Sequence, residues 1–407
     1  MTALVVHGIG ALCTCDPLAG EAPGVVRDAA LVASDGIISY AGPESELGRS
    51  DVPKGALEIQ ARGAAVIPGF VDAHTHLVWL GDRGDEYARR AAGESYEAIA
   101  AAGGGIRATV RATAAGSVDE LTTAARARAL RMLAHGTTTV EVKSGYGLDH
   151  DAEMRELDAA VRLGIWDDLP EVVPTYLPLH ATPDGPRDAY IDAVCTLGVA
   201  DAARRGAGFV DAFCEDGAYT VAECERVFTA AREHRLRPKV HAEQRSHSGG
   251  ALLAARAGAV SADHLEHATE EDLRALAGAG VVGVILPGAS LVVGGPPPPG
   301  RRLLEAGCTV AVATDCNPGT CYSDSMPLMV SLAVAIGGLT PSQALVAATA
   351  GGAAALALHD RGMLRAGMRC DAVILNTPSW IDVAYHLGGD IVASVLRQGR
   401  LAVPSKT

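Results

Sequence analysis

Two histidines separated by a single residue, His74 and His76, follow an apolar run at residues 66–73. In a β-strand, residues two apart point to the same face, so both imidazoles would project from one side of the chain. Two imidazoles on one side form half of a typical metal site. An isolated His-x-His pair is more often accidental than a ligand pair, so its meaning depends on the rest of the chain.

Three more residues of ligand type occur where later strands are expected to end. His241 and His264 each close an apolar segment, and Asp315 follows another. In α/β barrels the active site lies at the C-terminal ends of the strands. Together with His74 and His76, these residues predict a metal site at the mouth of a barrel, and chance placement becomes the poorer explanation.

The middle of the chain contains the elements that would have to position these residues. Apolar segments of strand length alternate there with helical stretches, and capping boxes at residues 117–120 and 220–223 mark helix starts. Eight strands in such alternation predict a closed parallel (β/α)₈ barrel, a TIM-like α/β fold. The candidate strands are residues 66–73, 137–143, 171–177, 208–213, 239–242, 260–264, 281–286 and 310–313.

The two ends of the chain lack this alternation. Residues 1–63 contain short apolar or β-branched segments with an Asp-Gly hairpin signal, and residues 365–407 contain two strand-like segments with a Gln-Gly turn. We therefore expect residues 1–63 plus 365–407 to form one small β-sandwich domain. Residues 64–364 would form the barrel.

Composition limits the kinds of molecule that the protein is expected to bind and where it is expected to occur. The 407 residues carry a formal net charge of −14 and no long block of like charge, so we expect neither nucleic acid nor an anionic membrane surface as a partner. Uncharged stretches at 278–300 and 325–358 are interrupted by proline and glycine, which favours buried barrel elements over membrane spans. Nine scattered cysteines and the lack of a signal peptide predict a reducing, cytoplasmic location.

Several longer motifs occur in order over nearly the whole chain. They include His74-Thr75-His76 and residues 103–106, 141–148, 241–244, 261–265, 286–288 and 313–319. On these motifs the chain resembles the amidohydrolase superfamily and, more narrowly, its imidazolonepropionase family. The Lys-Ser-Gly-Tyr-Gly and Asp-x-Asn-Pro-Gly segments are the most specific to that family.

The resemblance implies a metal-dependent hydrolase of histidine degradation that converts 4-imidazolone-5-propanoate to N-formimino-L-glutamate. One divalent or trivalent ion per chain, Zn or Fe, would be held by His74, His76, His241 and Asp315. Asp315 would also take a proton from the attacking water, and His264 would orient that water or stabilise the developing oxyanion. A carbamylated Lys143 bridging two metals is the alternative, which the mononuclear family pattern disfavours.

The resemblance also implies contacts to a small-molecule substrate. Arg83, with Tyr96 or Tyr146, would bind the propanoate, and Gln244 and His180 would hold the ring. Asn317, Gly319 and Thr320 would line the loop after the eighth strand. Some relatives carry Glu at position 244; Gln244 cannot accept a proton, so a catalytic role there is doubtful although it can bind the ring.

Two other classes of function stay open at this point. A purine or pyrimidine deaminase of the same superfamily would share the metal site without needing an arginine that binds an anion. A metal-binding scaffold without catalysis would also keep the ligands, but His264 and all four ligand positions are present. The choice between Zn and Fe is open because imidazole and carboxylate suit both, and a homodimer is expected from the resemblance.

Overall fold

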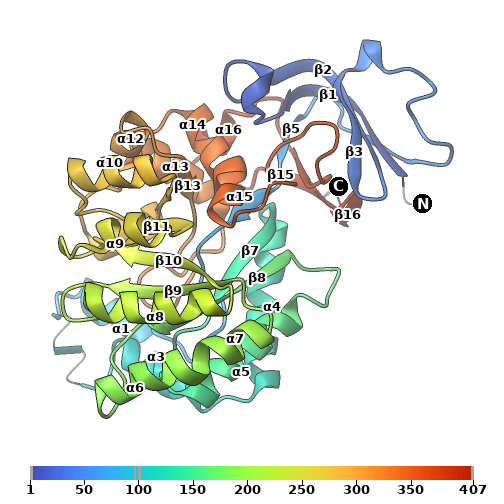
Figure 1. Ribbon diagram of the computed structural model, residues 1–407. Helices are drawn as coiled ribbons and strands as arrows, with labels where there is room; N and C mark the ends of the chain where they lie inside the picture. The colour runs from blue at the N-terminus through green and yellow to red at the C-terminus, as the bar shows by residue number, and fades with distance from the viewer. Residues whose placement is uncertain (1–2, 96–97, 100–101, 405–407) are drawn as a thin grey trace.

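The structure is a computed structural model that describes residues 3–95, 98–99 and 102–404. It contains two sheets (Figure 1). One is parallel and surrounded by helices, and the other combines strands from both ends of the chain, so that the N-terminal and C-terminal segments lie side by side.

The parallel sheet is the predicted barrel, and its eight strands follow one another in chain order. Each strand pairs in parallel with the next, as the alternation of strands and helices requires. The strands are β6 (Phe70–Asp72), β7 (Thr137–Lys143), β8 (Glu171–Leu179), β9 (Phe209–Cys214), β10 (Arg237–Ala242), β11 (Ser261–His264), β12 (Val282–Ile285) and β13 (Val310–Val312).

Helices surround this sheet, and their starts agree with the sequence signals. The capping boxes at Ser117 and Thr220 are formed, each side chain accepting from the backbone N–H three residues later. The helices of the barrel are α1 (Gly84–Ala91), α3 (Ile106–Ala114), α4 (Val118–Ala134), α5 (His150–Leu163), α6 (Arg187–Ala193), α7 (Val199–Arg204), α8 (Val221–Glu233), α9 (Gly250–Ala257), α10 (Glu270–Ala279), α11 (Pro287–Val293), α12 (Gly300–Glu305), α13 (Met326–Ala335), α14 (Pro341–Val346) and α15 (Gly352–Ala355). A short π-helix, η4 (Ala347–Gly351), leads into α15, and another, η3 (Val194–Gly198), joins α6 to α7.

The second sheet brings the ends of the chain together. Its order is β16-β15-β14-β5-β1-β2-β3, with β4 also paired to β1. The strands are β1 (Ala3–Cys13), β2 (Val25–Ser34), β3 (Ile37–Pro43), β4 (Leu57–Gln60), β5 (Ala65–Pro68), β14 (Ala372–Leu375), β15 (Val392–Arg397) and β16 (Arg400–Val403). Short helices η1 (Pro17–Ala19), η2 (Glu44–Glu46) and α16 (Asp382–Tyr385) lie in its connections. Both predicted two-residue turns are formed, with positive φ at Asp35, Gly36, Gln398 and Gly399.

The first predicted barrel strand is divided. Residues 66–73 were expected to form one strand, but β5 belongs to the terminal sheet and only β6 belongs to the barrel. Gly69 lies between them, and a Cβ there would overlap the side chain of Thr138. Close packing against β7 thus requires glycine at the point where the chain passes from one sheet to the other.

The barrel closes only at its C-terminal end. No ladder joins β6 to β13, but the residues beyond these strands do pair. The amide of Asp315 donates to the carbonyl of His74 at 3.0 Å, and the amide of His76 donates to Cys316 at 3.1 Å. The Asp72 carboxylate accepts from the Thr314 amide at 3.0 Å and from its hydroxyl at 2.6 Å. The seam is therefore tied where the predicted ligands lie.

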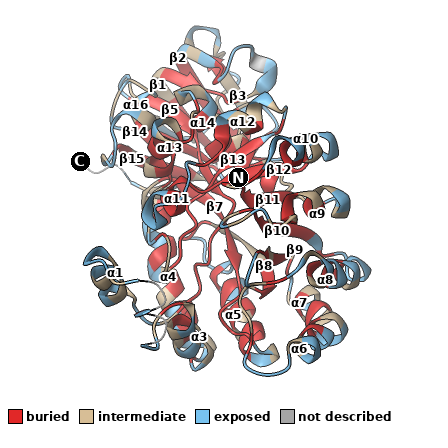
Figure 2. Ribbon diagram, turned by 90° about the vertical axis from the view of Figure 1, so that its left-hand side faces the viewer, coloured by how far each residue is buried: buried red, intermediate tan, exposed pale blue. Residues whose placement is uncertain are grey.

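Burial follows this architecture. Figure 2 shows the barrel strands buried at the centre, with exposed residues on the outer faces of helices and in loops. All nine cysteines are free thiols. Within the described ranges, no helix has both the length and the apolar character needed to cross a membrane.

Candidate metal centre

Four of the predicted residues meet at the C-terminal end of the barrel. One Asp315 oxygen lies 3.6 Å from His74 Nε2 and 3.6 Å from His76 Nε2. His241 Nε2 lies 3.4 Å from His76 Nε2. His264 joins them, with its ring centroid 5.4 Å from that of His241. All five side chains are almost completely buried.

The donor atoms have the arrangement that a metal ion needs. His74, His76 and Asp315 each offer one ligand atom within 4.8 Å of the others, and so do His74, His241 and His264. His74 Nε2 is buried and has no hydrogen-bond partner within the protein. A buried nitrogen left without a partner is costly, and a cation at the centre of the cluster would supply one. The residues present therefore fit one metal ion.

Burial sets the protonation of the cluster. Burial, followed by nearby Lys143 and the neighbouring imidazoles, lowers the pKa of His74 well below its usual value. The pKa values of His76 and His264 are lowered in the same direction, again first by burial. Neutral imidazoles are the form that binds a metal. Burial also raises the pKa of Asp315 to about 7, against the lowering effect of His241.

The backbone turns sharply at the ends of the strands that carry the cluster. His264 has a φ of 79° and Asp315 a φ of 52°, and Glu243, two residues after His241, has a φ of 54°. Non-glycine residues rarely adopt this left-handed conformation, and such strain is concentrated at functional sites. These turns direct the ends of β10, β11 and β13 toward one point.

Lys143 lies close to the cluster but is engaged by acids. Its Nζ is 2.8 Å from Glu141, 2.7 Å from Asp211 and 3.7 Å from Asp263. Although burial alone would lower the pKa of this amine, the three carboxylates raise it above its usual value. A carbamate would place a fourth negative group among three carboxylates, which argues against the bridging alternative.

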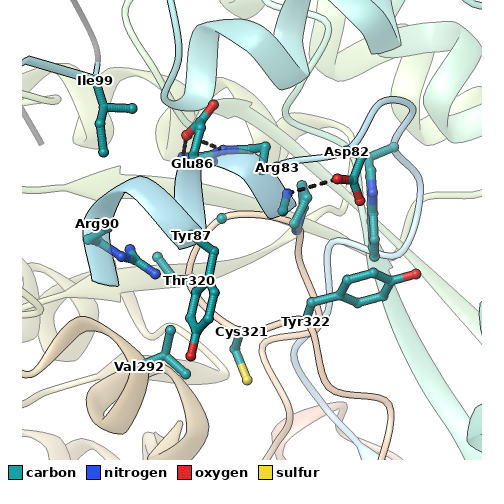
Figure 3. Close-up of a pocket in the computed structure, with 14 residues that line it drawn as sticks. Asp82, Arg83, Glu86, Tyr87, Arg90, Ile99, Val292, Thr320, Cys321 and Tyr322 are labelled. Atoms are coloured by element: carbon teal, nitrogen blue, oxygen red, sulfur yellow. Dashed lines mark hydrogen bonds and ion pairs between the residues drawn. The ribbon is translucent and has the colours of Figure 1, made fainter. Parts of the chain in front are cut away.

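A pocket of about 340 Å³ opens between the loop after β6 and the loop after β13. Arg83, Gly319 and Thr320, all predicted substrate contacts, line it together with Tyr87 and Tyr322 (Figure 3). Thr320 also donates its hydroxyl to Asp315 at 3.2 Å, so the pocket adjoins the histidine cluster. Arg83 brings a guanidinium to this pocket, where Glu86 pairs with it at 2.9 Å.

Two more predicted contacts lie against the cluster. The His180 ring stacks on that of His76 with centroids 4.7 Å apart, and its Nδ1 lies 2.9 Å from the carbonyl oxygen of Gly145. Burial and nearby His241 lower the pKa of His180 to about 3. The Tyr146 ring lies 5.9 Å from His76. Burial raises the pKa of its hydroxyl well above the usual value, with Asp315 raising it further and Arg83 lowering it.

Three predicted contacts remain, namely Asn317, Gln244 and Tyr96. The Asn317 amide donates to the Asp315 carbonyl and to Thr320, each at 2.7 Å, so this side chain shapes its own loop. Gln244 is half-buried and, in the part of the chain that the structure describes, its side chain makes no hydrogen bond. Tyr96 lies outside the described residues.

Sequence reasoning missed several buried charged residues beside the cluster. Glu266 accepts from the Ser290 hydroxyl at 2.6 Å, and its other oxygen lies 3.9 Å from His264 Nδ1. Asp211 and Asp263 contact the backs of two histidines. The pattern that could have found them is an acid in a strand that also carries a candidate ligand, or in the strand beside it.

Comparison with known proteins gives consistent matches. The amidohydrolase family model matches residues 65–402. The chain is 44% identical to an imidazolonepropionase of Deinococcus radiodurans, covering 98% of this chain and 99% of that protein. It is 45% identical to one of Symbiobacterium thermophilum, covering 98% and 97%. Among solved structures, a zinc-bound adenosine deaminase from Xanthomonas campestris has a TM-score of 0.76 at 19% identity, covering 100% of this chain and 94% of that one. That likeness concerns the fold.

Proposed function

Since this chain belongs to the amidohydrolase family and, within it, to the imidazolonepropionases, we propose that it hydrolyses 4-imidazolone-5-propanoate to N-formimino-L-glutamate. The observation that carries the proposal is full-length similarity to enzymes of that name. The convergence of three histidines and an aspartate at the barrel mouth supports it, because opening a cyclic amide with water needs an activated nucleophile.

One metal ion, Zn or Fe, would be held by His74, His76, His241 and Asp315. When bound, such an ion polarises a carbonyl and lowers the pKa of water from about 15.7 to roughly 7. The neutral imidazoles described above suit this role. Imidazole and carboxylate ligands accept both metals, so metal analysis is needed to choose between them.

The remaining chemistry belongs to side chains around that position. Asp315 accepts the proton of the attacking water and passes it to the ring nitrogen that departs when the amide bond breaks. One Asp315 oxygen is held by the Thr320 hydroxyl. His264, held neutral by burial, can donate a hydrogen bond to the oxygen that becomes negative. His180, stacked on His76, lies where it can contact the substrate ring. Arg83 binds the propanoate through its guanidinium.

The decisive experiment combines a substrate panel with metal analysis of the purified protein. We expect turnover of the imidazolone, no deamination of guanine or cytosine, and close to one Zn or Fe per chain. Replacing both histidines, His74→Ala with His76→Ala, should abolish metal binding and turnover together. Deamination without ring opening would favour a purine or pyrimidine deaminase instead. Retained metal in the double variant would refute the assignment of His74 and His76 as ligands.

The location and assembly of the protein are separate proposals. A cytoplasmic enzyme is consistent with nine free thiols, since such a compartment keeps cysteines reduced. A homodimer stays a prediction, which sedimentation of the purified protein would test.

A further inference from the structure

Five charged side chains pack together inside the barrel in contact with the histidine cluster. They are completely buried, and two are cations while three are anions: Lys143, Lys239, Glu141, Asp211 and Asp263. Buried charges are expensive unless they are paired. We therefore expect this network of five buried charges to have a function that apolar side chains in the same place could not provide.

Two of these acids hold the backs of the proposed ligands. One oxygen of Asp263 lies 2.6 Å from His74 Nδ1, and one oxygen of Asp211 lies 3.0 Å from His241 Nδ1. A carboxylate at Nδ1 favours the tautomer that carries its proton there. The Nε2 atoms of both rings are then free of protons, and they are the atoms that face Asp315 and His76.

Lys143 connects the two acids. Its Nζ is 2.7 Å from the same Asp211 oxygen that faces His241, and 3.7 Å from the same Asp263 oxygen that faces His74. Other bonds fix the second oxygen of each acid: Ser261 donates to Asp263 at 2.6 Å, and the Ala212 amide donates to Asp211 at 2.7 Å. Without the ammonium, two carboxylates would face each other in a region that excludes water.

We infer that Lys143 is a positioning residue for the metal centre, acting through Asp211 on His241 and through Asp263 on His74. This inference rests on the proposed function, since it takes these two histidines as ligands. In this role Lys143 is a permanent cation that keeps two imidazoles in one orientation. A carbamylated Lys143 would instead be an anion that binds metal directly. Partners behind metal ligands typically contribute ~10- to 100-fold to metal affinity.

Lys239 is the matched control. It is equally buried and belongs to the same network, but its Nζ contacts Glu141 at 3.0 Å and the carbonyl of Ala73 at 2.9 Å. Among the described residues it forms no ion pair with Asp211 or Asp263. Burial raises the pKa of Asp263, and through space the charge of Lys239 lowers it more than that of Lys143 does, so the two lysines differ mainly in the contact of Lys143 with Asp211. Lys143→Met and Lys239→Met therefore each remove one positive charge from the same buried network. Only Lys143→Met also removes a direct contact with Asp211 and Asp263, the acids behind the proposed ligands.

The measurement is the dissociation constant for Zn²⁺, obtained by competition with a chelator, alongside thermal unfolding. We expect Lys143→Met to raise this constant ~10- to 100-fold and Lys239→Met to raise it far less. Equal weakening by both variants, or wild-type affinity in Lys143→Met, would overturn the inference. Wild-type protein that binds no Zn²⁺ or iron would instead refute the proposed function as well.

A second pair keeps the test valid if Lys143→Met does not fold. Asp211→Asn is compared with the double variant Lys143→Met/Asp211→Asn, in which one cation and one anion are lost together. If Lys143 acts largely through Asp211, the double variant should bind Zn²⁺ about as well as Asp211→Asn alone. A further loss of ~10-fold or more beyond that of Asp211→Asn would mean that the two act independently, against the inference.

Discussion

The Arg83 side chain is held from two sides. Its Nε and Nη2 each lie 2.9 Å from one oxygen of Glu86 (Figure 3). The other Glu86 oxygen accepts from the Gly105 amide at 3.1 Å. The opposite edge of the guanidinium lies over Gly319, where a Cβ would overlap it. Glu86 thus links the arginine to the glycine-rich loop, and the lack of a side chain at position 319 leaves room for it.

Replacing this arginine should affect substrate binding selectively. Arg83→Met should lower kcat/KM for the imidazolone ~10- to 200-fold, mostly through KM, because a charged hydrogen bond contributes roughly 1.5–3 kcal/mol. Metal content should be unchanged. Steady-state kinetics with the substrate and with an imidazolone lacking the propanoate would measure this. Equal losses on both substrates would show a structural role.

Two neighbours provide controls for that prediction. Gly319→Ala should displace the guanidinium and therefore act in the same direction as Arg83→Met. Glu86→Gln keeps the shape but weakens the tether, so its effect on KM should be smaller than that of Arg83→Met. In the Arg83→Met background, Gly319→Ala should add little, because its effect passes through the arginine.

At the scale of elements, a helical segment covers the open seam between β6 and β13. It can approach both strands because glycines lie at the points of contact. Gly352, at the start of α15, lies so close to β6 that a Cβ would overlap the carbonyl oxygen of Val71. Gly351, at the end of η4, has the same relation to Val310 of β13. These two glycines bring one helical segment against both strands that do not pair with each other.

This packing reverses the usual effect of alanine in a helix. Gly352→Ala should destabilise the protein by ~1–3 kcal/mol, the usual cost of overpacking, although alanine favours helices. Gly278→Ala in α10, where no atom lies within 4 Å of the added Cβ, should instead stabilise by up to about 1 kcal/mol. Denaturant unfolding of both variants would measure the difference. Stabilisation in both would mean that α15 can move away from the seam.

At the scale of the whole molecule, the proposed ligands join distant parts of the chain. His74 and His76 follow β6, His241 belongs to β10, and Asp315 follows β13. The ion would therefore connect the first and last barrel strands with one on the opposite side. Binding to the folded state alone stabilises it by about 4 kcal/mol when free metal is a thousand times its dissociation constant.

Removing the metal should consequently lower the midpoint of thermal unfolding by several degrees. Calorimetry with and without a chelator would measure the shift, and added Zn²⁺ should reverse it. The His74→Ala/His76→Ala variant should not respond to the chelator, because its site is absent. A chelator effect that persists in this variant would place the stabilising ion elsewhere.

The linear sequence already shows the alternation of strands and helices in the middle of the chain, the strand-like segments at its two ends, and the residue types at the strand ends. These are local properties: apolar periodicity, caps and turns act over a few residues and remain visible in the linear chain. The His-x-His pair and Asp315 could be proposed for the same reason, since parallel strands in a barrel end on one side.

The way in which buried groups meet across the barrel is visible only in the folded protein. Lys143, Asp211 and Asp263 lie on three strands, and nothing in their local sequence shows that one ammonium faces both carboxylates. The division of residues 66–73 at Gly69 is similar, because both halves are apolar and the need for glycine comes from close packing against Thr138 of a later strand. Such contacts depend on distances between segments far apart in the chain, and periodicity carries no information about them.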